Sequence, residues 1–293
     1  MEGRTPSDFG GLAALALNLL LLVAGLVPFG LGTLLARASG LTIGLGTALL
    51  GLMAVVSLHL AAWAARGAYG PEPGRWPLPW GWPAARWQRF GRHCLMLAAV
   101  CGLMLQVGLS TGPLTLPLVG MGVVGSHFLF APPLALARRG LGEVAAALGF
   151  GLLPVFAGYY LQTGHGLTEI LLLGVPLSLA AFNLFLIWGL PAPDSPATPT
   201  LGARLSPPGV GLLFTVVNIL TIVALCFVLL FPAVPLPSRW GLFALLGLAL
   251  VNQELIKRRA YAREERLTLV ARLLLLQQVA MGLVFAWGLL PRL

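Results

Sequence analysis

The chain of 293 residues is 58% hydrophobic and only 9% charged. A surface that faces water normally carries about 25% charged residues, so this composition excludes an ordinary soluble protein. The formal net charge of +9 suits a basic face beside anionic lipid headgroups and gives no reason to expect a nucleic acid partner.

Apolar stretches close to the roughly 20 residues that cross a bilayer recur along the whole chain. Because lipid cannot satisfy free backbone N–H and C=O groups, each stretch is predicted to be a helix. The expected fold class is therefore an all-α integral membrane protein, in which residues 1–293 form a single polytopic domain. The nine predicted spans lie near residues 10–36, 41–65, 93–110, 113–131, 143–162, 167–190, 210–232, 238–256 and 267–290.

The distribution of Lys and Arg orients these spans, because basic residues collect in short cytoplasmic loops. With the N-terminus in the cytoplasm, all of the 18 basic residues except Arg37, Arg239 and Arg292 fall on the cytoplasmic side. The residues before the first span show no cleavage pattern, so we expect no removable signal peptide. We expect a protein of the bacterial inner (cytoplasmic) membrane with its N-terminus in the cytoplasm.

Cysteine and histidine give no sign of a metal site. Cys94, Cys101 and Cys226 lie in or beside apolar spans and lack the spacing of a zinc site. The four histidines are scattered over separate loops and span ends. Serine and histidine also occur without a nucleophile signature such as G-x-S-x-G. We therefore expect the cysteines to be core residues and expect no bound metal.

The middle of the chain carries the most specific pattern, "FAPPLALARRGLGEVAAALGFGLLPVFAGYYLQTG" from Phe130 to Gly164. A proline pair, Pro132 and Pro133, is followed by the basic turn Arg139 to Glu143 and then by Tyr159 to Gly164. Proline cannot continue a helix, and an acid suits the positive N-terminus of the next one. This order resembles the UbiA superfamily of intramembrane prenyltransferases, particularly the menaquinone branch that prenylates dihydroxynaphthoate. The resemblance implies nine helices around a central cavity.

The resemblance also gives a counterpart to "HLAAWAARGAYGPEPG", residues 59 to 74. The family has a motif of the form N-D-x-x-D-x-x-x-G-x-D-x-P-E in this loop, and its carboxylates hold Mg²⁺ against the diphosphate of an isoprenoid donor. Mg²⁺ requires such hard oxygen ligands. In this chain Glu72 matches the motif, whereas the asparagine and three aspartates are replaced. The replaced positions are His59, Leu60, Trp63 and Tyr69.

The second aspartate-rich motif of the family has its counterpart before Thr200 to Leu205, which resembles a T-L-A-x-R-L sequence. Counting back from Thr200 places the two acidic positions on Gly189 and Pro193. Asp194 lies one residue out of register, where it is either a displaced ligand or a solvated turn residue. Both motifs have therefore kept their frame and lost their acids, so we expect no cofactor, and Mg²⁺ only if an active enzyme remains.

Five arginines are expected near the same cytoplasmic mouth, namely Arg66, Arg75, Arg138, Arg139 and Arg204. Guanidinium groups bind phosphate bidentately, so these residues could form a metal-free site for a diphosphate or an anionic headgroup. The alternative is that they orient the protein and contact lipid. We favour the second interpretation from the sequence.

Three hypotheses for function follow from these observations. The favoured one is a catalytically silent protein of UbiA type that binds an isoprenoid or quinone-like lipid, or that serves as a subunit of a membrane complex. The alternative is an active polyprenyl transferase that uses an aromatic acceptor and an arginine-based diphosphate site. A transporter is the third, without a charged residue at mid-membrane or paired interrupted helices to support it. Six aromatic residues suit an interface or a protein contact: Trp63, Tyr69, Trp76, Trp80, Trp82 and Trp87.

Overall fold

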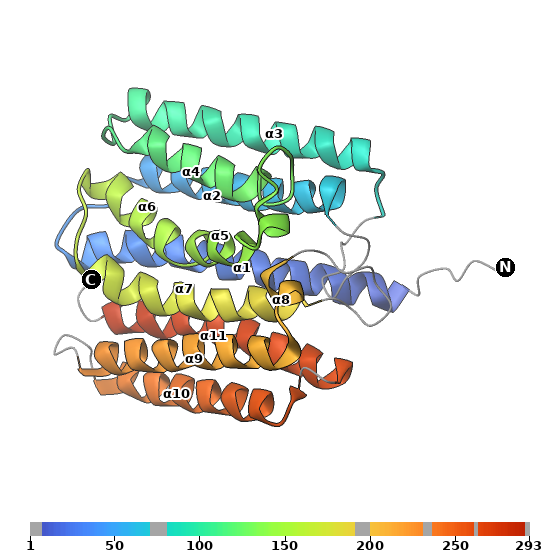
Figure 1. Cartoon of the computed structure of the whole chain (residues 1–293). Helices are drawn as coiled ribbons and strands as arrows, with labels where there is room; N and C mark the ends of the chain where they lie inside the picture. The colour runs from blue at the N-terminus through green and yellow to red at the C-terminus, as the bar shows by residue number, and fades with distance from the viewer. Residues whose placement is uncertain (1–7, 71–80, 191–199, 231–235, 261–262, 291–293) are drawn as a thin grey trace.

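The computed structural model describes residues 8–70, 81–190, 200–230, 236–260 and 263–290. Figure 1 shows a bundle of roughly parallel and antiparallel helices. The elements are α1 (Asp8–Ala38), α2 (Leu45–Tyr69), α3 (Ala84–Leu103), the π-helix η1 (Met104–Gly108), α4 (Thr115–His127), the 3-10 turn η2 (Leu136–Arg139), α5 (Gly142–Gly149), α6 (Leu152–Thr163), α7 (Glu169–Trp188), α8 (Leu201–Arg204), α9 (Pro207–Leu230), α10 (Leu236–Lys257) and α11 (Glu264–Leu289).

Eight helical segments in the described part of the chain are long and apolar enough to cross a membrane, with α5 and α6 together forming one of them. The predicted helical membrane protein is thus confirmed, whereas the count of nine is not. The difference is α4, which has 13 residues where residues 113–131 were predicted to span. Pro113 precedes this helix, and the chain turns from Phe128 onward, ahead of Pro132 and Pro133.

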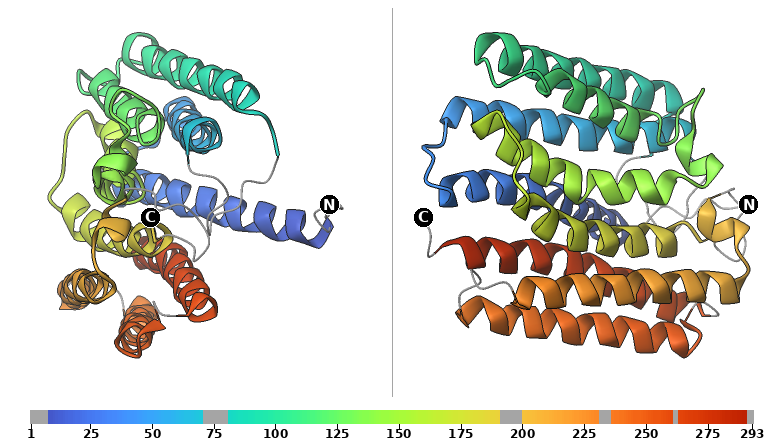
Figure 2. Two further views of the ribbon diagram at one scale, coloured as in Figure 1. Left: turned by 45° about the vertical axis from the view of Figure 1, so that its right-hand side comes forward. Right: turned by 60° about the vertical axis from the view of Figure 1, so that its left-hand side comes forward.

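The helices form two groups around a shared middle (Figures 1 and 2). On one side α2 packs against α3 and α4, and on the other α10 packs against α9 and α11. Between them, α1 contacts α6 and α11, while α7 contacts α5, α9 and α11. We call one end of the bundle the basic end. It is the end where α2 finishes, at Tyr69, and where α3 begins, at Ala84. Of the described basic residues, only Arg37 and Arg239 belong to the helix ends at the opposite end.

Two glycines allow α1 and α6 to approach closely. A Cβ atom at Gly32 of α1 would lie within 3.0 Å of the carbonyl oxygen of Val155 in α6. A Cβ atom at Gly158 of α6 would be equally close to the carbonyl oxygen of Phe29 in α1. Because lipid offers no hydrophobic drive between helices, such close backbone contact is a main source of helix association in membranes.

The predicted span 143–162 is interrupted between α5 and α6. Proline lacks an N–H group and its ring clashes with the carbonyl of the residue four positions earlier, which for Pro154 is Phe150. The freed carbonyl oxygen of Phe150 accepts a hydrogen bond from Nε2 of Gln278 in α11 at 2.8 Å. The N–H of Leu152 donates to Oγ of Ser178 in α7 at 2.9 Å. These two hydrogen bonds connect the interruption to α11 and to α7.

Buried amide side chains connect the three C-terminal helices. Asn218 of α9 donates through Nδ2 to the carbonyl oxygen of Ala249 and to Oε1 of Gln253, both in α10. Asn252 of α10 donates in turn to Oε1 of Gln277 in α11 at 2.9 Å. Side-chain hydrogen bonds of this kind hold transmembrane helices together.

Candidate functional site

The described parts of the two motif segments lie at the basic end of the bundle. The turn η2 links them through two arginines. Nη2 of Arg138 donates to the carbonyl oxygen of Tyr69 at 3.1 Å, and Nη2 of Arg204 donates to the carbonyl oxygen of Arg138. A chain of hydrogen bonds thus runs from the end of α2 through η2 to α8.

His59, predicted to stand at the first position of the first motif, makes its contacts within the protein. Its Nδ1 atom donates to the carbonyl oxygen of Val55 at 2.8 Å, which places the proton on Nδ1. The ring meets Phe150 edge to face, with 4.8 Å between ring centroids. Its Nε2 atom lies against Gly25 of α1, where a Cβ atom would collide with it. His59 therefore packs α2 against α1 and the interrupted span.

Trp63, predicted to stand at one of the next two acidic positions, belongs to the hydrophobic core, and Leu60, predicted at the other, packs against that core. Trp63 is 3% exposed and lies in one cluster with Ile187 and Phe150, against which Leu60 also packs. The predicted placement of Trp63 at an interface is therefore wrong, because its ring is buried inside the bundle. Trp87, from the same aromatic group, is also buried.

Tyr69, at the last acidic position, is partly buried and meets His127 edge to face. Glu72 and Arg75, together with Trp76 and Trp80, lie outside the described residues.

The described part of the first motif does not fit Mg²⁺. This ion needs near-octahedral oxygen coordination, whereas Leu60 and Trp63 have no oxygen and no nitrogen that could take the place of a carboxylate. Among the residues that the structure describes, no group of three or more His, Cys, Asp or Glu side chains could hold a metal ion.

In the second motif Gly189 is fixed by its backbone. Its N–H donates to the carbonyl oxygen of Phe185 at 2.8 Å, and its own carbonyl oxygen accepts from Oγ1 of Thr200 at 2.6 Å. Thr200 also caps α8, because Oγ1 accepts from the N–H of Ala203. Pro193 and Asp194, the other two positions considered from the sequence, lie outside the described residues.

Glu143 is the buried acid of this end of the bundle, and its contact with the second motif was missed from the sequence. Its side chain is 3% exposed, and its carboxylate lies close to the backbone N–H groups of Leu201 and Gly202 in α8. Its Oε2 atom is buried and has no hydrogen-bond partner among the described residues. A Cβ atom at Gly189 would lie 3.0 Å from Oε1 of Glu143. The sequence suggested that this acid faces the start of its own helix, and no local signal indicates the contact across to α8.

Three arginines of the basic end donate hydrogen bonds to main-chain oxygens of the protein. Besides Arg138 and Arg204, Nη2 of Arg139 donates to the carbonyl oxygen of Pro133 at 3.0 Å. Arg66, in the last turn of α2, is 8% exposed. Hydrogen bonds to main-chain carbonyls from Arg138, Arg139 and Arg204 hold η2 and α8 in place, so these three arginines support the fold.

The YYLQTG sequence lies at the opposite end of the bundle and ties loops together there. Oη of Tyr160 accepts a hydrogen bond from the N–H of Leu114 at 2.9 Å. Oε1 of Gln162 accepts from the N–H of Gly44, which begins α2, at 3.0 Å. Gly164 ends α6 with φ of 73°, a conformation that glycine adopts without strain. These contacts give the motif a structural role.

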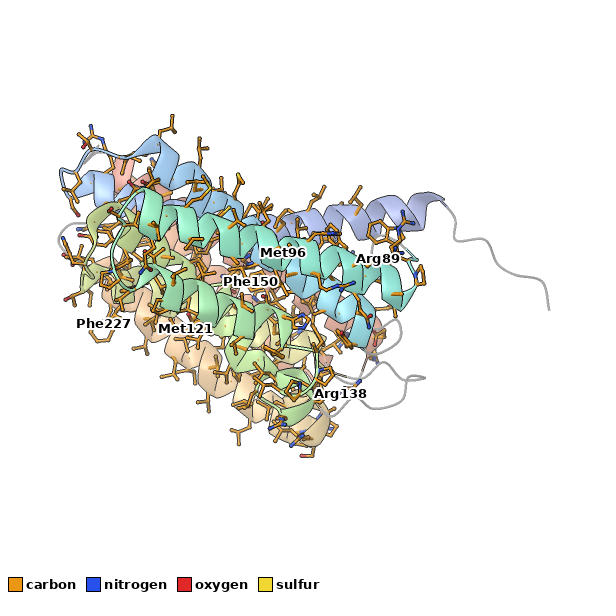
Figure 3. All side chains as sticks on the ribbon, turned by 90° about the horizontal axis from the view of Figure 1, so that it is seen from above. Arg89, Met96, Met121, Arg138, Phe150 and Phe227 are labelled. Atoms are coloured by element: carbon orange, nitrogen blue, oxygen red, sulfur yellow. The ribbon has the colours of Figure 1, made fainter. Side chains whose placement is uncertain are left out.

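A cavity of about 120 Å³ lies beside the first motif, between α2, α4, α5 and α6. Most of its wall is apolar, and His59 and Ser126 contribute the polar side chains. Gly125 and Gly149 face it, and a Cβ atom at either position would meet nothing within 4 Å. Figure 3 labels Met121 and Phe150, which line it from α4 and from the interruption. Small residues on facing helices, at Gly122, Gly125 and Gly149, are the sequence signal that could have indicated it.

No protein-family model matches the sequence, and no curated protein matches it. Among solved structures, the apo form of a UbiA homologue from Aeropyrum pernix K1 is similar, with a TM-score of 0.66 and 17% identity over 89% of this chain and 96% of that one. A digeranylgeranylglyceryl phosphate synthase is similar with a TM-score of 0.64 and 13% identity, over 95% of this chain and 99% of that one. The chain has the UbiA fold.

At these identities the likeness extends to the fold alone. The UbiA arrangement predicted from residues 130–164 is thus confirmed, and the menaquinone branch stays a prediction. The replacement of the family's acids at Leu60, Trp63 and Gly189 likewise stays a prediction.

Proposed function

We propose that this protein is a UbiA-type membrane protein that binds an isoprenoid or quinone-like lipid and does not carry out metal-dependent prenyl transfer. The observation that carries the proposal is the burial of Trp63 in the hydrophobic core, with Leu60 packed beside it. A position that would present a carboxylate to metal instead contributes an indole ring to the packing of α2. Neutralising a departing diphosphate needs free cationic groups in fixed positions, whereas Arg138, Arg139 and Arg204 each donate to a main-chain oxygen.

The cavity beside His59 is the proposed lipid site. Binding pockets for small apolar molecules are concave and mostly apolar, with a few polar groups that fix orientation. The cavity has this character, since His59 and Ser126 stand among aliphatic and glycine positions. An isoprenoid chain or a quinone ring would bury apolar surface there, and a hydroxyl group would face the side chain of Ser126.

The proposed function takes place in a membrane. The protein is an integral membrane protein whose long helices are apolar. We further propose that the basic end faces the bacterial cytoplasm, because the described basic residues other than Arg37 and Arg239 belong to that end. A partner subunit is the second candidate for what the protein binds.

Filling the cavity tests the lipid site. We expect Gly125→Leu to reduce the isoprenoid or quinone lipid that co-purifies with the protein by about tenfold or more, because the added side chain occupies space that is open in the native protein. The measurement is extraction and mass spectrometry of retained lipid per mole of protein. Gly120→Leu is the matched control, since Gly120 lies on the same helix, has open space around it and does not line the cavity.

Two results would contradict this proposal. One is retained lipid whose composition matches the surrounding membrane in the native protein. The other is an equal amount of isoprenoid or quinone in the native protein and in Gly125→Leu. A stoichiometric protein subunit that co-purifies without such lipid would instead favour the second candidate.

A further inference from the structure

The first turns of α3 carry a basic surface that takes no part in the site described above. Arg86, Arg89 and Arg92 are exposed there, and the sequence of α3 contains no acid. Within the described residues, none of the three forms an ion pair. This helix lies at the outer edge of the bundle and packs against α2, α4 and η1 (Figures 1 and 2). Its other sides therefore face the surroundings of the protein.

Aromatic side chains hold part of this surface in place. The guanidinium carbon of Arg86 lies 4.6 Å from the ring centroid of Trp82, which is cation–π contact. Trp82 in turn packs on Trp87, with 4.8 Å between ring centroids, and meets Phe90 edge to face. Trp87 is buried against Gly67 of α2. The aromatic group thus anchors Arg86 to the rigid contact between α2 and α3.

After the arginines, further along α3 toward Leu103, the same side of the helix becomes apolar. Residues spaced by three or four positions share a helix face, so Arg89 is followed along one stripe by Met96, Val100 and Leu103. Met96 is 64% exposed and Val100 is 51% exposed, which for such side chains in this protein means contact with lipid chains. Figure 3 shows Arg89 and Met96 along this helix, with Arg89 nearer its beginning.

We propose that this stripe is a binding surface for a phospholipid with an anionic headgroup. The phosphate and any further negative charge lie against Arg86, Arg89 and Arg92, and an acyl chain lies along Met96, Val100 and Leu103. Charge complementarity favours an anionic lipid, because guanidinium groups donate paired hydrogen bonds to phosphate. The exposed apolar residues that follow the arginines along α3 favour a lipid, because its acyl chain would contact them. A free phosphate ion would contact the arginines alone. This surface lies outside the cavity and is independent of the proposed function.

The test compares lipid binding by native mass spectrometry after delipidation, with phosphatidylglycerol and phosphatidylcholine as probes. Basic residues near an anionic membrane surface each strengthen binding roughly fivefold, so R86Q/R89Q/R92Q is expected to weaken phosphatidylglycerol binding on the order of 100-fold. R86K/R89K/R92K keeps the charges and is expected to retain most of the binding. R263Q/R266Q/R272Q, at the start of α11 and within it, removes the same charge elsewhere at the basic end and is expected to leave the bound phosphatidylglycerol within about twofold of native.

Several results would overturn the proposal. These are equal binding of the two lipids by the native protein, undiminished phosphatidylglycerol binding by R86Q/R89Q/R92Q, or an equal loss in the α11 variant. Displacement of the lipid by millimolar inorganic phosphate would show a phosphate site in place of a lipid site. Unchanged lipid binding together with loss of a co-purifying protein would assign the surface to a protein partner.

Discussion

Gly158→Ala is expected to destabilise the protein by at least about 3 kcal/mol, at or beyond the upper end of the usual cost of overpacking. The reason is that its Cβ atom would collide with the carbonyl oxygen of Phe29, which belongs to a helix backbone and has no rotamer to change. Gly32→Ala meets the same obstacle from the other side, at the carbonyl oxygen of Val155. Thermal unfolding in a fixed detergent, followed by circular dichroism, measures the loss.

Gly30→Ala is the matched control for this prediction. Gly30 is two residues from Gly32 on α1, and a Cβ atom there meets nothing within 4 Å. Since alanine is favoured over glycine in a helix by about 1 kcal/mol, this control should be neutral or slightly stabilising. Equal melting temperatures for Gly158→Ala and Gly30→Ala would mean that α1 and α6 are further apart than the structure has them.

Glu143→Leu is expected to loosen the contact between α8 and α5. Leucine removes the carboxylate that lies close to the backbone N–H groups of Leu201 and Gly202, and a buried N–H group that loses its acceptor costs about 1–3 kcal/mol. Glu143→Gln keeps one oxygen in place and should behave much more like the native protein. Hydrogen exchange of the amides in residues 200–205 reports the effect directly, and should accelerate in Glu143→Leu.

The control for this change is Glu265→Leu, an exposed acid at the start of α11 that is also replaced by leucine. It should leave exchange in residues 200–205 as it is in the native protein. Unchanged exchange in Glu143→Leu would show that the carboxyl group does not hold α8, and would remove the link between α5 and the second motif.

The general fold could be predicted because its signals are local. Lengths of apolar sequence define the spans, and the order from Pro132 to Gly164 indicates the UbiA arrangement that the solved structures share. The interruption at Phe150 was missed, although Gly149, Gly151 and Pro154 mark it. A hydropathy window averages over such residues, and the compensating hydrogen bond comes from Gln278, 128 positions away.

Less of the site could be predicted, because it depends on contacts between distant helices. The sequence shows that Leu60 and Trp63 cannot bind metal, but not that Trp63 packs with Ile187 inside the core. It likewise identifies Arg138 and Arg204 as possible phosphate ligands, without showing that each donates to a main-chain oxygen. The cavity beside His59 depends on which faces of α2, α4 and α5 meet, which one sequence does not specify.

The absence of metal-dependent prenyl transfer is the central claim, and turnover measures it most directly. Purified protein is given a prenyl diphosphate, Mg²⁺ and an aromatic acceptor, with and without a chelator, beside a preparation of an active UbiA-type enzyme. We expect no prenylated product above the protein-free background, and none from L60D/W63D/Y69D, because Gly189 of the second motif also lacks an acid. Product that disappears with chelator would contradict the account by revealing a rebuilt metal site, and product that persists in chelator but is lost in Arg66→Ala or Arg139→Ala would contradict it in favour of an arginine-based enzyme.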